Sequence, residues 1–371
     1  MNSRQTRIGI AAAGVGCVAA FSLRAAFLVG RGETYDLESW RIVIAILRQG
    51  KGLYLETQRY NYSPLWAGVL YGLDGLSGIS RMSLPLLLSL VFLVVDLATA
   101  ALVRAIARRR GESELQAFFM ALLFFANPVS VIVSSRLFAF ANLSIAFLLL
   151  ALVSRSRSAA RPAAAAGWLS LSLLAKHVTW FHPLLFARRR GEPRLSWPAA
   201  LSPYVLFALS FVPFRKQWLG IWQNVFRYRG LSEPYGTEAL RFVSWLPRET
   251  ATIVFVLAAL AGVFFLARVE LERACLLLFL VLLIFTPGIC PYYFVWPVAL
   301  GALFPSAGYL VYTLVITAFF LNSPDVLGLD WPHLPGWGGC WWATVFWLLW
   351  EIRDIRSAGK AAAGTNASTI A

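Results

Sequence analysis

Charged residues are almost absent from the long apolar runs of this chain. They make up only 14% of its 371 residues, whereas 59% are hydrophobic and 15% are aromatic. This composition excludes a water-soluble core and is typical of a membrane protein. Because one crossing needs about 20 apolar residues, we predict an all-α polytopic transmembrane bundle of about 11 or 12 membrane segments. Residues 1–356 would form a single integral-membrane domain, and residues 357–371 a disordered cytoplasmic tail.

The sequence also lacks the motifs of several kinds of soluble chemistry. It has no Walker A loop, no Rossmann glycine fingerprint and no His-Glu-x-x-His, and its four cysteines show no Cys-x-x-Cys spacing. His177 and His182 flank an expected helix break without nearby carboxylates, which favours a polar lining over metal ligands. We therefore expect no cofactor and assign no metal ligands, and metal dependence stays open.

The formal net charge of +15 comes from short clusters of basic residues between the apolar runs. This placement is the positive-inside pattern of membrane proteins and argues against a nucleic-acid partner. Placing all clusters in the cytoplasm puts both termini of this multi-pass protein there. The clusters are Arg4 and Arg7; Arg108, Arg109 and Arg110; Arg155, Arg157 and Arg161; Arg188, Arg189 and Arg190; Arg268 and Arg273; and Arg353, Arg356 and Lys360.

The charge pattern predicts two long loops outside the membrane. Residues 8–29 form an outward anchor, and residues 30–63 the first outer loop. Within this loop Leu37, Trp40 and Ile44 share one helical face, which predicts an amphipathic interfacial helix over 37–48. Residues 65–79 are too short for a comfortable crossing and favour a re-entrant or surface hairpin. Residues 214–247 form the second outer loop.

Two of the later apolar runs contain breaks. The run 115–134 is interrupted at Asn127-Pro128, between an inward span at 84–106 and another at 137–153. Basic clusters flank residues 162–187 on both sides, so this stretch enters and leaves by the same face. It is expected to form two short helices that meet near Lys176. Further runs at 249–267, 274–286, 292–305, 306–322 and 338–350 lead to the cytoplasmic tail.

The order of several short motifs resembles the integral-membrane GT-C glycosyltransferases. The first outer loop carries Asp36, then a helix with Trp40, then Gly50-Lys51-Gly52-Leu53-Tyr54 and Tyr60-Asn61-Tyr62-Ser63-Pro64. Later segments of the same kind are Asn127-Pro128 with Asn142, Lys176 in a broken helix, and Pro287-Gly288 before Tyr292, Tyr293 and Trp296. Many members have a Gly-Gln-x-Asn or His-Gly-Gln-like element where this chain has Ala139-Phe140-Ala141-Asn142, so only Asn142 is retained.

The resemblance implies a multi-pass enzyme of a bacterial cytoplasmic (inner) membrane that is similar to bacterial mannosyltransferases. Such an enzyme moves a mannose-like hexose, with inversion, from a polyprenyl-phosphate sugar donor to a lipid or glycan acceptor on the non-cytoplasmic face. Asp36, at the end of the first span, is the candidate general base, with Glu38 in reserve. The alternative for Asp36 is the N-cap of the helix that follows.

A leaving polyprenyl phosphate needs cations, and three basic residues are candidates for that role. Lys176 is the first, because a charged ammonium in an apolar helix costs about 2.5 to 3.5 kcal/mol and must be compensated. The alternative is a structural ion pair with Asp96. Arg227 and Arg229 in the second outer loop could clamp phosphate, or could be solvated loop charges. Sugar or acceptor contacts are expected from aromatic and amide side chains that also suit a membrane interface: Tyr60, Tyr62, Asn142, Tyr228, Tyr292, Tyr293 and Trp296.

Two other functions compete with the enzyme. A secondary transporter or lipid flippase would use Asp96 and Lys176 as midplane groups, and it should show inverted internal repeats, which are not evident here. A non-catalytic scaffold in an envelope-assembly complex is the other alternative.

Overall fold

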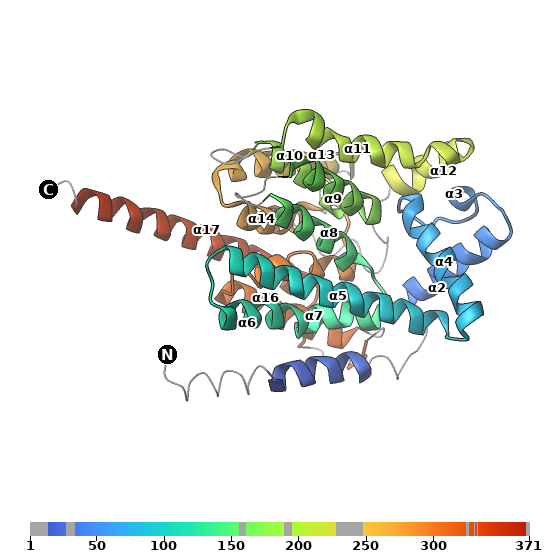
Figure 1. Cartoon of the computed structure of the whole chain (residues 1–371), viewed down its shortest axis with the longest axis horizontal. Coiled ribbons are helices and arrows are strands. Elements are labelled where there is room, and N and C mark those ends of the chain that lie inside the picture. Colours follow the sequence, from blue (N-terminus) through green and yellow to red (C-terminus); the bar gives the residue numbers. More distant parts are fainter. Residues whose placement is uncertain are drawn as a thin grey trace.

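The computed structural model describes residues 14–26, 34–155, 161–188, 195–227, 248–323, 326–329, 331 and 333–368. Every regular element in these ranges is a helix, which confirms the predicted all-α fold. The helices α2–α4 lie at one end of the molecule, and the last helix, α17, projects from the opposite end (Figure 1). The division of the chain at residue 356 stays a prediction, and α17 (Trp337–Ser368) continues as a helix beyond that point.

Two described helices are long and apolar enough to cross a membrane. These are α5 (Leu84–Arg109) and Glu249–Arg268, which comprises most of α13 (Arg248–Phe265) and the following η5 (Leu266–Arg268). The number rises to four if each of two bent helix pairs makes one span. The described helices Gly14–Ala26, Ala141–Ser154 (α8), Pro162–Ala175 (α9) and Ala307–Asn322 (α16) are apolar but shorter. The predicted 11 or 12 segments would have to include such short helices.

The predicted first outer loop contains two helices, α2 (Tyr35–Arg48) and α3 (Leu53–Glu56), and α4 (Pro64–Ser80) follows it. The predicted helix at 37–48 is present, but it begins earlier because the Thr34 side chain accepts a hydrogen bond from the Leu37 amide. Its apolar face is not free for the interface, since Trp40 is buried against the rings of Trp66 and Phe140. The hairpin expected at 65–79 is wrong: α4 is one continuous helix of 17 residues, started by Ser63 and Pro64.

The break at Asn127-Pro128 is where the sequence predicts it. Helix α6 (Glu114–Phe125) ends there, and α7 (Pro128–Val131) with η1 (Ile132–Arg136) continues at an angle of 47°. Proline has no amide hydrogen, and the Asn127 side chain caps the new helix by accepting from the Val129 amide at 3.0 Å. Its amide nitrogen also donates to Tyr309 and Thr313 of α16.

The segment before the second outer loop is broken at Lys176, as predicted. Helix α9 (Pro162–Ala175) ends at Lys176, which has an extended backbone, and the chain continues as η2 (His177–Thr179) and α10 (His182–Arg188). Helix α11 (Trp197–Ser210) then turns by 55° into the short elements η3 (Val212–Gln217), α12 (Trp218–Ile221) and η4 (Trp222–Phe226). The core of the bundle is completed by α14 (Leu271–Phe285), η6 (Pro291–Val295) and α15 (Val298–Gly301).

Candidate functional site

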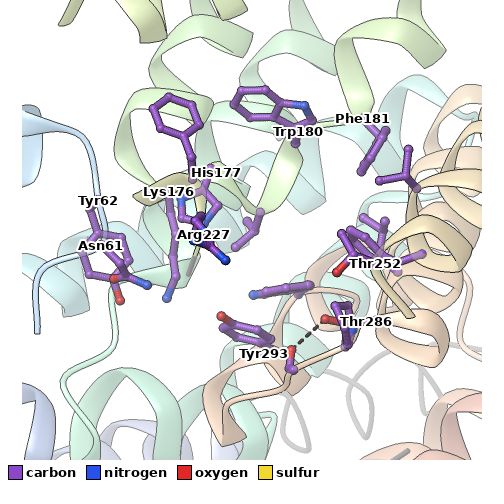
Figure 2. A pocket seen from close by; sticks show the side chains of 18 residues that line it. Asn61, Tyr62, Lys176, His177, Trp180, Phe181, Arg227, Thr252, Thr286 and Tyr293 are labelled. Atoms are coloured by element: carbon purple, nitrogen blue, oxygen red, sulfur yellow. Dashed lines mark hydrogen bonds between the residues drawn. The ribbon is translucent and has the colours of Figure 1, made fainter. Parts of the chain in front are cut away.

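A cavity of about 360 Å³ lies beside the break at Lys176. The lining comes from residues 176–181, from α13 and the end of α14, from η6 and the loop before α4, and from Phe226 and Arg227 (Figure 2). Phe181, Phe255 and Leu282 make part of the surface apolar. Lys176, His177, Arg227, Thr252 and Thr286 bring polar groups into the same space. The lining of the cavity therefore combines cationic and apolar side chains.

Lys176 is the most unusual side chain in this lining. Its residue is only 3% exposed, and its ammonium nitrogen has no hydrogen-bond partner among the described residues. Instead the nitrogen faces aromatic rings, at 4.2 Å from the ring centroid of Tyr292 and 5.3 Å from that of Tyr62. Cation–π contacts and the nearby charge of Asp36 offset part of the desolvation cost. A buried ammonium without hydrogen bonds still has unused capacity for an anion.

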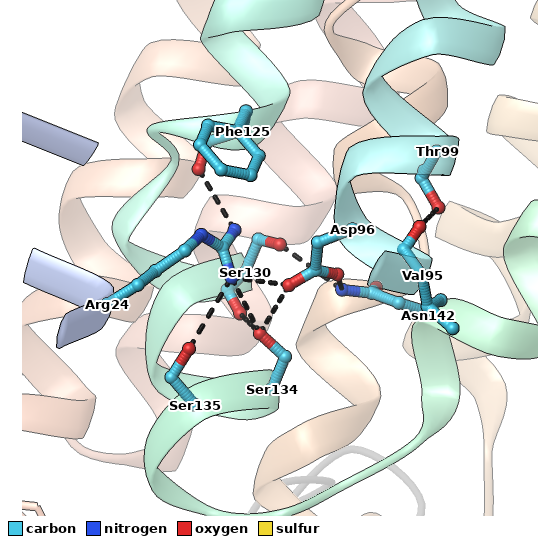
Figure 3. Close-up of polar contacts among 9 residues, drawn as sticks. All are labelled: Arg24, Val95, Asp96, Thr99, Phe125, Ser130, Ser134, Ser135 and Asn142. Atoms are coloured by element: carbon cyan, nitrogen blue, oxygen red, sulfur yellow. Dashed lines mark hydrogen bonds and ion pairs between the residues drawn. The ribbon is translucent and has the colours of Figure 1, made fainter. Parts of the chain in front are cut away.

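The alternative role of Lys176, a structural ion pair with Asp96, is wrong. Asp96 pairs instead with Arg24 of the helix Gly14–Ala26, and both side chains are buried. Ser134 donates to Asp96 at 2.6 Å, and Arg24 also donates to the backbone oxygen of Phe125 at 2.9 Å (Figure 3). A carboxylate with these partners is already satisfied, so it leaves Lys176 to the cavity.

Asn142 belongs to the Asp96 network and not to the cavity lining. Its amide nitrogen donates to Asp96 at 2.6 Å and to Ser130 at 3.2 Å (Figure 3). The proposed sugar or acceptor contact of Asn142 therefore has no geometric support in this structure. Its role is to orient the buried carboxylate of α5.

Arg227 contributes the second cation of the cavity. It follows η4, its side chain is exposed, and its amide donates to the Trp222 backbone at 2.9 Å. Figure 2 shows its guanidinium in the same space as the Lys176 ammonium. Tyr228 and Arg229, expected to act with it, lie outside the described residues.

The two tyrosines of the loop before α4 have different positions. Tyr60 is fully buried, donates to the Ser63 backbone and accepts from the Ala67 amide, so it fixes the loop and does not line the cavity. Tyr62 does line the cavity. Burial raises the pKa of both hydroxyls, and they stay protonated near neutral pH. The Ser63 hydroxyl ties the loop to α9 through the Leu174 carbonyl.

The two carboxylates of α2, Asp36 and Glu38, differ in burial and in their partners. Asp36 lies in the first turn, two residues after Thr34, so the predicted N-cap role belongs to Thr34. Asp36 is buried and its charge acts on Lys176, but it does not line the cavity. Glu38 is exposed and pairs with Arg59 at 2.7 Å, and this hydrogen bond raises the pKa of Arg59.

The aromatic residues after α14 form one side of the site. Tyr293 and Trp296 stack at 4.3 Å between ring centroids, and both line the cavity. Tyr292 is the ring closest to the Lys176 nitrogen. Among the described residues there is no group of three His, Cys, Asp or Glu side chains that could hold a metal ion.

Several polar residues of the cavity and of the Asp96 network were not predicted from the sequence. Thr252 and Thr286 line the cavity, and Thr286 donates to the Gly288 carbonyl at 2.7 Å. Neither threonine stands out within an apolar run. Arg24 did give a signal, because it is a charge inside the predicted first span, but nothing in the sequence names its partner.

Comparison with known proteins identifies the family of the chain. A family model described as GPI transamidase subunit PIG-U matches residues 34–223, just over half of the chain. No curated protein and no solved structure matches the chain. The matched region includes residues 34–63 of the predicted first outer loop and Lys176, and it ends before Arg227.

This match corrects the predicted function. The GT-C resemblance implied hexose transfer from a polyprenyl-phosphate donor, whereas the family found is that of a transamidase subunit. The predicted glycosyltransferase activity is therefore wrong, and the sugar donor and acceptor lose their support. The non-catalytic subunit of a complex, an alternative from the sequence, agrees better with the family.

Proposed function

Because the chain belongs to the family of GPI transamidase subunit PIG-U, we propose that it is a non-catalytic membrane subunit of a multi-protein complex. In this proposal the cavity beside Lys176 binds the anionic headgroup of a lipid and presents it to a partner subunit. The family supports the role as a subunit, and the cavity supports the kind of ligand.

The buried ammonium of Lys176 is the observation that carries the proposal. A buried ammonium without hydrogen-bond partners is costly, and a phosphate oxygen would supply the missing hydrogen bonds. Arg227 would add a second, bidentate contact to the same phosphate. Tyr293 and Trp296 would pack against the ring of an inositol or sugar headgroup.

The apolar wall supports a lipid over a soluble anion. Val256 of α13 lines the cavity, is partly exposed, and is followed by the more exposed Leu257. Phe226 also lines the cavity and is exposed. A headgroup in the cavity could therefore continue into an acyl chain along α13 without leaving apolar surface.

The proposal keeps the topology inferred from the arginine clusters. The loops 30–63 and 214–247 face away from the cytoplasm, both termini are cytoplasmic, and the helical arrangement is GT-C-like. The family match says nothing about a bacterial cytoplasmic membrane, which stays a prediction. Impermeant labelling of single cysteines at positions 51 and 109 tests the topology, and only position 51 should react in intact cells.

Native mass spectrometry of the purified protein tests the ligand. We expect retention of phosphatidylinositol over phosphatidylcholine, and Lys176→Met should lower that retention about tenfold or more, as for a lost charge-assisted hydrogen bond. Lys51→Met removes an exposed lysine outside the cavity and is the matched control. Equal retention by the Lys176→Met protein and the parent would remove the proposed site.

A further inference from the structure

The segment Val212–Phe226 has two faces of opposite character. It follows α11 after the 55° turn and consists of η3, α12 and η4. By length and composition α11 and this segment could make one broken span. The contacts of the two faces favour a different arrangement.

The inner face of the segment is fixed to α3. A Cβ atom on Gly220 would lie 1.9 Å from the Tyr54 carbonyl oxygen, so only glycine allows this approach. Asn224 donates to the carbonyls of Tyr54 and Thr57 at 3.0 and 2.9 Å. Gln217 accepts from the Tyr54 amide at 2.9 Å. These contacts hold the part of the segment from Gln217 to Asn224 against Tyr54 and Thr57.

The outer face is a row of large exposed apolar side chains. Trp218 is 55% exposed, Leu219 65% and Trp222 46%, and Phe226 continues the row. The rings of Trp218 and Trp222 lie 6.3 Å apart, and those of Trp222 and Phe226 5.9 Å apart. Exposed aromatic rings of this kind are typical of the membrane interface, where the apolar acyl region meets the polar headgroups.

The charge of the segment specifies the sign of that boundary. Its charged residues are Arg215 and Lys216, both exposed, and it contains no acidic residue. Their position one turn before Trp218 places cations beside the aromatic row. This is the pattern of a helix that lies in the interface of an anionic lipid surface.

We propose that residues 212–226 lie flat in the membrane interface on the non-cytoplasmic side and bind anionic phospholipid headgroups there. In this arrangement they do not complete a span with α11. Trp218, Leu219, Trp222 and Phe226 enter the acyl boundary, while Arg215 and Lys216 contact phosphates. Because Phe226 and Arg227 line the cavity, the segment sets the cavity entrance at headgroup depth. The proposal concerns a separate surface and does not depend on what occupies the cavity.

Nitroxide depth measurements on the full chain in nanodiscs test this arrangement. Single labels replace Val212 and Gln223, both exposed, in a Cys17→Ser background; the three other cysteines are buried. A flat segment places both labels at similar shallow depths, within about 10 Å of the headgroup level. A spanning segment separates them by about 16 Å, since a helix rises about 1.5 Å per residue. That separation would overturn the proposal. So would labels shielded from both oxygen and an aqueous nickel chelate, which would show that protein covers the face.

The lipid charge is tested separately. The two-residue variant Arg215→Gln/Lys216→Gln should lower the preference for phosphatidylglycerol over phosphatidylcholine among co-purified lipids about thirtyfold, for two interfacial cations. Arg353→Gln/Arg356→Gln makes the same charge change on α17 and is the matched control. An unchanged preference in the first variant, or an equal loss in both, would contradict the anionic-lipid contact. Failure of the cavity experiment with Lys176→Met leaves these outcomes unaffected.

Discussion

The ammonium nitrogen of Lys176 lies 4.2 Å from the ring centroid of Tyr292, and no described residue gives it a hydrogen bond. Aromatic faces attract the cation without consuming its three donors. The site is therefore stable enough to bury the charge while it stays available for a ligand. This arrangement connects the break after α9 with the turn before α15.

The Arg24–Asp96 pair should be a structural bridge between the first described helix and α5. Arg24→Met would leave a buried carboxylate without its cation, which typically costs about 3 to 5 kcal/mol. Thermal unfolding in detergent should therefore show a clear loss for Arg24→Met. The combination with Asp96→Leu should recover most of it, and a double variant no better than Arg24→Met alone would contradict the pair.

Gly220 should tolerate no side chain, because of its contact with the Tyr54 carbonyl. We expect Gly220→Ala to destabilise the protein by about 1 to 3 kcal/mol through overpacking. Gly68→Ala, within α4, meets no atom within 4 Å and should be neutral or slightly stabilising. Comparable melting temperatures for the two variants would show that the segment is not held as described.

Asn127 should stabilise the break in the α6–α7 pair. Asn127→Ala removes the cap on Val129 and two bonds to α16, and the expected cost is about 1 to 2 kcal/mol. Ser83 starts α5 without a side-chain cap, so Ser83→Ala is the control and should cost little. A thermal shift of similar size in both variants would argue against the cap.

Because Tyr60 is buried, we expect the protein to lose stability at high pH. Burial raises the pKa of Tyr60 above its ordinary value of 10.0. A raised pKa in the folded state means that the unfolded chain releases its proton first. Stability is therefore complete below pH 10 and falls as the pH rises above it. Tyr60→Phe should flatten this decline in a pH series of unfolding curves, although it loses two hydrogen bonds at neutral pH.

Local features were predictable from the sequence, and distant partners were not. The breaks at Asn127-Pro128 and Lys176 follow from proline chemistry and from basic clusters on both sides of an apolar run. The partner of Asp96 is 72 residues away, and Arg24 and Lys176 are equally plausible partners without coordinates. The hairpin predicted at 65–79 is wrong because the length of an apolar run does not show whether it folds back, and α4 continues as one helix through its glycines.

A density map of the protein in nanodiscs of phosphatidylinositol is the most direct test of the central claim. The account predicts a phosphate within hydrogen-bond distance, about 2.7 to 3.2 Å, of the Lys176 ammonium, with Arg227 directed at the same group. It also predicts acyl density continuing along α13. A lipid-free cavity, with the Lys176 ammonium hydrogen-bonded to the Asp36 carboxylate, would contradict it.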